Sequence, residues 1–343
     1  MKALVNFSAE PRSVELRDLP VPAARPDQVL LQVKAVGVCG SDLHQWLGNQ
    51  SWKVNYPVTL GHEFCGVISE VGADVTQFKP GDRVVSETHA VVDESSPYWR
   101  TGQYHIDPAR LGFGYGVNGA MAEFVAVPER CLHRLPENLP FEKAALVEPC
   151  CVAYNAVCCH GAVRPGESVA VIGPGPIGLL CAQMAKISGA NPLFLIGTPA
   201  DEARLKQGLA VGVDKTFDGS EDPLSAILGA GDGYGCDIAI DAAGVSATLD
   251  LAIRLVRPGG RIVKVGWGPQ PYGMSLDPLV QKAITLHGSF SHNWPIWERV
   301  IHMLATGQID LTHILSLTAP LDEWESAFNA MHRGSAVKAV LIP

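Results

Sequence analysis

The hexapeptide GPGPIG, residues 173–178, constrains the fold of this chain more than any other stretch. It follows the short apolar pattern SVAVIG and opens the helical pattern IGLLCAQMAKISGA. In a dinucleotide-binding turn, the first glycine allows the tight turn, the second lets the backbone approach the pyrophosphate, and the third allows close helix–strand packing. The helix N-terminus faces the anion. A glycine-rich turn without a ligand is the alternative, but this context predicts a dinucleotide site. Its predicted residues are Gly173, Gly175, Pro176, Ile177 and Gly178.

Strand and helix patterns alternate after residue 148. Apolar strand patterns at 168–173, 191–197, 236–244 and 259–267 are separated by helical patterns at 177–190, 201–213 and 246–256. Such alternation is typical of a doubly wound parallel sheet. Residues 1 to about 147 instead carry short β-branched runs broken by Gly, Pro and Asp, which predict antiparallel strands and turns. Two helical patterns, at 294–307 and 321–334, and a final strand close the chain. We therefore predict an α/β protein of two domains.

Composition limits the partners and the compartment. The formal net charge of −9 argues against a nucleic-acid or acidic-membrane partner, because phosphate binding needs a basic face. No apolar run approaches the roughly 18 residues of a membrane span. The start, MKALVNF, lacks the long apolar region of a signal peptide. We expect a cytoplasmic protein whose nine cysteines are thiols or metal ligands instead of disulfides.

The choice between NAD and NADP depends on the end of the second strand of the doubly wound sheet. An NAD site places an acidic residue about 20 residues beyond the glycine turn, where it binds the ribose 2′-hydroxyl. Here that count reaches Gly197 and Thr198, and no carboxylate occupies the strand end. Thr198 and Arg204 are candidates to contact a 2′-phosphate, whereas Asp201 lies close enough to fold back. The pattern favours NADP, and NAD stays open.

Two segments near the N-terminus offer metal ligands. GVCGSDLHQW (37–46) and LGHEFCG (60–66) contain Cys39, His62 and Glu63. They supply the thiolate, imidazole and carboxylate that catalytic zinc takes, in a site with three protein ligands and one open position. Taken singly, each residue has an ordinary alternative as a core thiol, a turn histidine or a solvated carboxylate. The residues alone do not decide between the two interpretations.

These motifs occur in a known order. GVCGSD, GHE, GDRV, EP and GPGPIG follow one another as in the zinc-dependent medium-chain dehydrogenases. The chain resembles their polyol (sorbitol) and threonine dehydrogenase branch over nearly its whole length. The resemblance implies a GroES-like β-rich catalytic domain of residues 1–149 and 288–343, and a Rossmann domain of residues 150–287 inserted between them. It also implies hydride transfer between a secondary alcohol of a polyol or sugar-like molecule and NAD(P), in a homo-oligomer such as a dimer or tetramer.

The resemblance also implies a ligand set for zinc. Cys39 and His62 resemble the constant ligands, and Glu63 resembles the carboxylate that ligates directly or exchanges with water. Glu148, in the EP pair, resembles the further acid that contacts the metal or its water. Asp42 resembles the carboxylate that orients His62, a contact that raises ligand basicity. Its ordinary alternative is a cap or turn residue.

A proton relay is implied in the same way. Ser41 resembles the hydroxyl that passes the substrate proton towards the cofactor ribose, and His44 the imidazole that delivers it to solvent. An imidazole suits this role because its ordinary pKa lies near operating pH. A helix-start serine and a surface histidine are the alternatives.

The chain departs from many of these relatives after GDRV. They hold a second, structural zinc with four cysteines, whereas no cysteine lies between Cys65 and Cys131 here. Polyol dehydrogenases often lack that zinc, so we expect one catalytic zinc and no structural zinc. Three aromatic residues of this lobe, residues 87–116, either pack locally, line the substrate entrance or form a subunit contact. They are Tyr98, Trp99 and Tyr104.

The substrate stays open among a cyclitol, a sugar alcohol, a sugar phosphate and a hydroxy amino acid. Six residues fall in segments that border the cleft by analogy, although each also fits core or rim packing. They are Phe113, Tyr115, Phe290, His292, Asn293 and Trp294. The rival functions are a zinc-free NADPH-dependent enone or quinone reductase and a non-catalytic dinucleotide-binding protein.

The stretch EPCCVAYNAVCCHGA (148–162) looks like a metal-binding cassette. Pro149 suits a first helical turn and Gly161 a stop, so we predict one helix from Cys150 to His160. Cys150 and Cys158 would then lie about 12 Å apart along the helix axis, too far for both cysteine pairs to bind one zinc through bonds of about 2.3 Å. We therefore expect buried thiols, with the metal chemistry of the stretch resting on Glu148.

Overall fold

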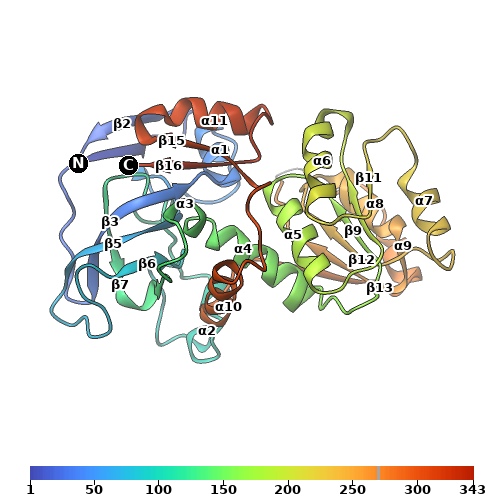
Figure 1. The fold of residues 1–343 in the computed structure, drawn as a ribbon, viewed down its shortest axis with the longest axis horizontal. Helices are drawn as coiled ribbons and strands as arrows, with labels where there is room; N and C mark the ends of the chain where they lie inside the picture. The colour runs from blue at the N-terminus through green and yellow to red at the C-terminus, as the bar shows by residue number, and fades with distance from the viewer. Residues whose placement is uncertain (269–270) are drawn as a thin grey trace. The chain divides into compact units, whose positions relative to one another are not determined.

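The structure is a computed structural model that describes residues 1–268 and 271–343 (Figure 1). The chain forms two compact units. The first comprises residues 1–148, 292–307 and 315–343, and the second residues 149–291 and 308–314. Residues 308–314 belong to the second unit because the Gln183 side chain pairs with the backbone of Asp310, donating to its carbonyl at 2.9 Å and accepting from its N–H at 2.8 Å. The sequence-based boundaries had placed this segment with the other domain.

The second unit contains one parallel sheet flanked by helices. Its strands are β9 (Val169–Ile172), β10 (Leu193–Ile196), β11 (Lys215–Phe217), β12 (Cys236–Asp241), β13 (Val256–Lys264) and β14 (Thr285–Gly288). Its helices are α5 (Pro176–Ile187), α6 (Glu202–Ala210), α7 (Pro223–Gly229), α8 (Ser246–Leu255) and α9 (Asp277–Gln281), with a 3-10 turn at Pro199–Asp201.

The strand order β11-β10-β9-β12-β13-β14 is that of a doubly wound dinucleotide fold. Every neighbouring pair is parallel. Figure 1 shows α5 and α6 on one side of the sheet and α7, α8 and α9 on the other. The central strands are apolar because helices cover both faces of such a sheet. All four residues of β9 are buried, for example.

The first unit is rich in β-strands. These are β1 (Lys2–Asn6), β2 (Val14–Asp18), β3 (Gln28–Gly37), β4 (Val58–Thr59), β5 (Glu63–Val71), β6 (Arg83–Ser86), β7 (Phe124–Pro128), β8 (Leu132–Arg134), β15 (Leu315–Pro320) and β16 (Lys338–Ile342). Its helices are α1 (Gly40–Leu47), α2 (Pro97–Arg100), α3 (Phe141–Ala144), α10 (Trp294–Ala305) and α11 (Trp324–His332), and its 3-10 turns are Tyr104–Ile106, Glu129–Cys131 and Leu321–Glu323. Helix α4 (Val147–Tyr154) begins in this unit and continues within the second unit, where it ends as a π-helical turn, Asn155–His160.

Two sheets organise this unit. A small sheet has the order β2-β1-β4, and a larger one has the order β15-β16-β3-β5-β6-β8, with β7 also pairing with β3. The large sheet joins distant parts of the chain, since C-terminal β16 lies beside N-terminal β3 (Figure 1). Gly37 at the end of β3 therefore pairs with Glu63 on one side and Val340 on the other. These two units confirm the predicted α/β architecture.

Each unit has its own apolar core. In the first, the large side chains of Trp46, Phe64 and Phe113 are almost completely buried. In the second, the core lies on the faces of the parallel sheet and includes Phe217 and Ile262. Within the described part of the chain, no helix combines the length and the apolar character that crossing a membrane requires.

Candidate functional site

Helix α1 begins directly after Cys39, which the sequence predicts as a metal ligand. Cys39 has an extended backbone conformation and precedes the first helical turn. Its N–H donates to Oδ2 of Asp42 at 2.8 Å, and its carbonyl accepts from the Asp42 N–H at 3.1 Å. The helix ends at Gly48, whose left-handed conformation (φ +68°) suits glycine. The fully buried Asp42 thus fixes the position of Cys39.

Three predicted ligands come together at the end of β3 and the start of β5. The donor atoms of Cys39, His62 and Glu63 all lie within 4.8 Å of one another. Oδ1 of Asp42 lies 3.9 Å from Nδ1 of His62, which is an ion-pair distance and not a hydrogen bond. Burial lowers the pKa of His62, but Cys39, Asp42 and Glu148 raise it more, and the net pKa is well above its usual value.

Glu63 is held by a residue that the sequence analysis missed. Its Oε1 accepts from Nζ of Lys338 at 2.6 Å, and both side chains are buried. Burial lowers the pKa of Lys338, but Glu63, Cys39 and Glu148 together raise it more, so the net pKa is above its usual value. A lysine within the apolar strand AVKAVLI was the available signal, because a buried lysine is almost always paired.

The Glu63 carboxylate occupies space that is free because residue 37 is a glycine and has no side chain. A Cβ atom at Gly37 would lie only 2.2 Å from Oε2 of Glu63. That oxygen is buried and has no hydrogen-bond partner within the described structure. An uncompensated buried carboxylate oxygen is costly, so a cation is the partner expected there.

Glu148 is bound by a histidine. Its Oε1 lies 2.9 Å from Nε2 of His292, which is fully buried. Burial raises the pKa of Glu148, but His292, His62 and Lys338 together lower it more, so the net pKa is below its usual value. Glu148 is not one of the three residues whose donor atoms converge within 4.8 Å, but its charge acts on both His62 and Glu63.

The predicted relay residues lie three positions apart on α1 and therefore share one side of the helix. Ser41 is half-buried in the first turn. Nδ1 of His44 lies 2.8 Å from Oδ1 of Asn49, and its ring packs edge-on against Trp52, with 6.2 Å between ring centroids. Asn49 and Trp52 were not predicted, because a contact with the loop after the helix leaves no periodic pattern in the sequence.

The donor set in this unit fits zinc. A thiolate, an imidazole and a carboxylate are typical zinc ligands, and a catalytic site uses three protein ligands. Two observations support this fit: Oε2 of Glu63 has no hydrogen-bond partner among the described residues, and the donor atoms of Cys39 and His62 lie close to that carboxylate.

The three glycines of the GPGPIG turn in the second unit have different environments. Gly173 has φ +98°, and a Cβ there would meet Ala243 at 2.9 Å. A Cβ at Gly178 would lie 1.8 Å from the carbonyl oxygen of Gly173. A Cβ at Gly175 would meet no atom of the described part of the chain within 4 Å. Protein packing therefore requires glycine at 173 and 178, whereas the open space beside Gly175 leaves room for a ligand. Pro176 begins α5, and Ile177 follows it in the first turn.

The end of β10 does carry a carboxylate in the folded structure. Oδ2 of Asp201 accepts from the N–H and hydroxyl of Thr198 at 3.0 and 2.8 Å. Its Oδ1 lies 3.6 Å from a guanidinium nitrogen of Arg204. Asp201 thus folds back to the strand end, where Thr198 and Arg204 compensate its charge.

The six residues considered for the substrate cleft have different surroundings. Phe113 is in the core, packed edge-on against Phe64, and His292 binds Glu148. Asn293 donates to the carbonyl of Gly102 at 3.0 Å. The other three are Tyr115, whose carbonyl accepts from Asn55 N–H, Phe290, which packs on Trp267, and Trp294, which is half exposed.

The lobe of residues 87–116 is held by a buried polar network. The Tyr104 hydroxyl donates to the carboxylate of Glu87 (2.8 Å to Oε2) and accepts from the N–H of Trp294 at 2.7 Å. His133 lies 3.1 Å from Oε1 of Glu87 and 2.5 Å from Oε1 of Glu298. Among the three alternatives for the aromatic residues of this lobe, Tyr104 therefore packs locally.

The cysteine-rich stretch differs in part from its prediction. Its helix begins at Val147, two residues before Pro149, and changes from α to π geometry at Asn155. Cys150 and Cys151 are buried as expected, whereas Cys159 is exposed. A switch to π hydrogen bonding depends on packing around the helix, so residue spacing alone does not reveal it.

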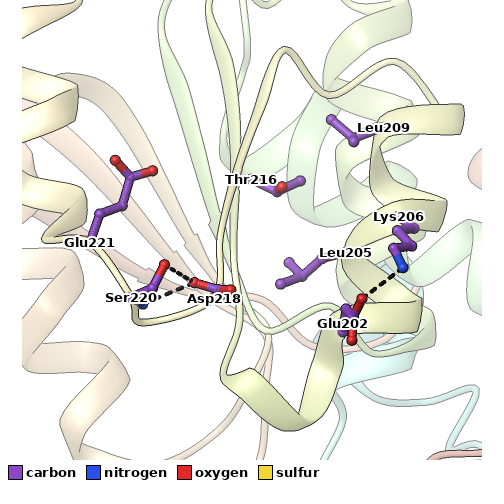
Figure 2. Close-up of a pocket in the computed structure, with 8 residues that line it drawn as sticks. All are labelled: Glu202, Leu205, Lys206, Leu209, Thr216, Asp218, Ser220 and Glu221. Atoms are coloured by element: carbon purple, nitrogen blue, oxygen red, sulfur yellow. Dashed lines mark hydrogen bonds and ion pairs between the residues drawn. The ribbon is translucent and has the colours of Figure 1, made fainter.

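A pocket of about 250 Å³ lies in the second unit between α6 and β11 (Figure 2). Its three carboxylates already have partners. Glu202 pairs with Lys206 at 2.7 Å, Glu221 pairs with Lys215 at 3.1 Å, and Asp218 accepts from Ser220 at 2.6 Å. None of the residues predicted for the site lines this pocket.

A β-rich domain with a thiolate, imidazole and carboxylate cluster, combined in one chain with a doubly wound dinucleotide fold, defines a class of oxidoreductases. The family model for the alcohol dehydrogenase GroES-like domain matches residues 25–137, and the model for zinc-binding dehydrogenases matches residues 176–306. The chain belongs to the zinc-binding, medium-chain dehydrogenase family, and within it to the polyol and threonine dehydrogenase branch.

Individual relatives match over the whole length of the chain. A sorbitol dehydrogenase of Halalkalibacterium halodurans is 34% identical, covering 100% of this chain and 99% of the relative. A D-arabitol-phosphate dehydrogenase of Enterococcus avium is 35% identical, covering 94% and 92%. The solved structure of a zinc-binding dehydrogenase from Sinorhizobium meliloti, bound to NADP, has a TM-score of 0.91 at 29% identity, covering 100% and 99%. The protein is thus an enzyme of the dehydrogenase type.

Proposed function

We propose that this enzyme transfers a hydride between a secondary alcohol of a polyol or sugar-like substrate and NAD(P), with one catalytic zinc. Cys39, His62, Glu63 and Glu148 would hold the metal. The observation that carries the proposal is the convergence of three zinc-type donor atoms within 4.8 Å, beside a buried carboxylate oxygen for which residues 1–268 and 271–343 supply no partner. When bound, zinc supplies Lewis-acid polarisation of the substrate oxygen, and the dinucleotide supplies the hydride acceptor.

The chain's own residues have separate tasks in this proposal. Asp42 fixes Cys39 through its backbone N–H and faces His62, which orients two ligands from one carboxylate. Ser41 would accept the proton of the substrate hydroxyl as it passes its own towards the cofactor ribose, and His44 would deliver a proton from there to solvent. The Nδ1 contact of His44 with Asn49 holds the imidazole in place for that transfer.

For the dinucleotide we propose NADP in preference to NAD. The support is that the charge of Asp201 is compensated by Thr198 and Arg204, so it repels a 2′-phosphate less than a free carboxylate at this position would. The NADP-bound relative is consistent with this preference. A catalytic efficiency at least tenfold higher with NAD than with NADP would contradict it.

We also propose that the enzyme is a cytoplasmic homo-oligomer. Cys65, Cys131, Cys181 and Cys236 are buried and form no disulfide, as is usual in a reducing compartment. The strand β14 ends the order of the parallel sheet, and its four residues are exposed. An exposed edge strand is a template for pairing with another chain.

Two measurements test the proposed function. Metal analysis of protein purified without chelator should find about one zinc per chain, and none would favour a zinc-free reductase or a non-catalytic binder. A panel of polyols, inositols, their phosphates and hydroxy amino acids should then be assayed with NAD and NADP separately, following reduced nicotinamide by absorbance. Oxidation of a sugar alcohol or its phosphate supports the proposal, and turnover of the hydroxy amino acids alone would contradict it.

A further inference from the structure

A short chain of hydrogen bonds connects helix α10 to Glu148. Nε2 of His292 lies 2.9 Å from Oε1 of Glu148, and Nε1 of Trp297 donates to Nδ1 of His292 at 2.8 Å. His292 and Trp297 are both fully buried. Both ring nitrogens of His292 are therefore engaged.

The chemistry of the indole decides which nitrogen of His292 carries the hydrogen. A tryptophan Nε1–H is a donor only, so Nδ1 of His292 must accept from it. In a neutral imidazole one nitrogen accepts and the other donates, so the hydrogen lies on Nε2 and points to Glu148. The indole cannot accept a proton in return, so this chain cannot carry protons away. His292 is a fixed donor and not a relay.

Trp297 is itself held in place. Its ring stacks on that of His133, with 5.5 Å between centroids and 8° between planes. Both ring nitrogens of His133 lie within hydrogen-bond distance of carboxylate oxygens, one from Glu87 and one from Glu298. The indole N–H therefore has a defined direction, and this direction fixes the imidazole of His292.

We propose that His292 and Trp297 are positioning residues for Glu148. His292 engages Oε1 and leaves Oε2 as the oxygen available to the metal, while Trp297 selects the His292 tautomer that can donate. This inference rests on the proposed zinc site, because it assigns a purpose to the orientation of one of its carboxylates. A partner of this kind typically changes metal affinity by roughly 10- to 100-fold.

The first test needs no metal. In zinc-free protein with ¹⁵N-labelled histidine, the chemical shifts of His292 should report a protonated Nε2 and an unprotonated Nδ1. In Trp297→Phe, which keeps an aromatic ring against His133, the His292 signals should show a mixture of tautomers. A protonated Nδ1 in the unmodified protein would overturn the proposal.

The second test measures zinc affinity by competition with a chelator. His292→Phe and Trp297→Phe should each weaken binding, His292→Phe by roughly 10- to 100-fold. His292→Gln retains an N–H near the position of Nε2 and should recover most of the loss. Trp324→Phe, a tryptophan of the same unit on α11, is the matched control and should bind zinc as the unmodified protein does.

The two possible failures are distinguishable. If the unmodified protein binds no zinc, the proposed function fails, whereas the tautomer measurement still stands by itself. If the unmodified protein binds zinc and both His292→Phe and Trp297→Phe bind it equally tightly, the positioning role is wrong. Circular dichroism and unfolding of each variant show whether it is folded, and failure of His292→Gln to exceed His292→Phe would also contradict the proposal.

Discussion

Two glycines of one turn have different reasons for being glycine. Gly175 has open space beside it and a backbone conformation that alanine also adopts, with φ −72° and ψ −177°. Gly178 lies against the carbonyl of Gly173. We therefore expect ligand binding to require glycine at position 175 and folding to require glycine at position 178.

Gly175→Ala should therefore weaken dinucleotide binding by about tenfold, or ~1.4 kcal/mol, because the methyl group occupies the space left for the ligand. Its stability should stay equal or rise by about 0.4–1 kcal/mol. Gly178→Ala should instead destabilise the fold by about 1–3 kcal/mol through overpacking. Fluorescence titration and urea unfolding measure the two effects, and unchanged affinity in Gly175→Ala would show that the open space is not the ligand's.

The buried pair of Glu63 and Lys338 is the strongest single ionic contact near the proposed metal. Lys338→Met should lower the free energy of unfolding of zinc-free protein by about 3–5 kcal/mol, because it leaves a buried carboxylate unpaired. Lys206→Met breaks the exposed pair with Glu202 and serves as the control, with no measurable loss expected. If both substitutions lowered the free energy of unfolding equally, burial would not determine how much an ion pair stabilises the fold.

His160 gives the second unit a dependence on pH. Burial and then the neighbouring His287 lower its pKa from 6.5 to about 4. The unfolded chain therefore binds a proton before the folded chain does, so this contribution is complete above pH 6.5 and is lost as pH falls from there towards about 4. His160→Gln should flatten the fall in stability over this window in urea unfolding at several pH values. An unchanged slope would rule out this histidine as a cause.

At the scale of elements, the lobe of residues 87–116 is attached to α10 through the Tyr104 hydroxyl. Burial, followed by the neighbouring Glu87, raises the pKa of Tyr104, so the hydroxyl stays a donor to that carboxylate. The same oxygen accepts the N–H of Trp294 at the start of the helix. One hydroxyl therefore bridges the Glu87 carboxylate, whose Oε1 also meets His133, and the backbone of Trp294.

Tyr104→Phe should cost about 1–3 kcal/mol of stability, because Glu87 and the Trp294 N–H each lose a partner. The lobe should also be cut faster in limited proteolysis. Tyr98→Phe, in the same lobe but with 37% of its surface exposed, is the control. Equal proteolysis rates for both variants and the unmodified protein would show that the hydroxyl does not anchor the lobe.

At the scale of the whole molecule, the exposed edge of the parallel sheet bears on assembly. Leu286 in β14 exposes 40% of its surface, and Val280 in the preceding helix exposes 74%. Apolar side chains beside an unpaired strand edge favour association with a second copy. Leu286→Asp should therefore reduce the mass measured by light scattering to that of a smaller assembly or a monomer.

Dinucleotide titration shows whether Leu286→Asp keeps its fold. An unmodified protein that is monomeric at micromolar concentration would contradict the proposed homo-oligomer, and an unchanged mass in the variant would place the contact elsewhere.

The sequence predicted the features that depend on residues close together in the chain. The alternation of strands and helices, the spacing of GPGPIG and the order of the motifs each lie within a few dozen residues, and they led to the architecture and the family. The candidate ligands Cys39, His62 and Glu63 were found for the same reason, since each belongs to a short motif.

Contacts between distant residues could be decided only by the tertiary structure. Lys338 meets Glu63 across 275 positions, and His292 meets Glu148 across 144, because the sheet and α10 return to the N-terminal domain late in the chain. The lysine within AVKAVLI signals a buried pair, but nothing in the sequence identifies Glu63 as its partner or His292 as the partner of Glu148, since such contacts depend on separation in space. The sequence by itself therefore determined the fold and the candidate ligands. The folded chain decided which buried partners orient those ligands, and how Asp201 returns to the strand end to meet Thr198 and Arg204.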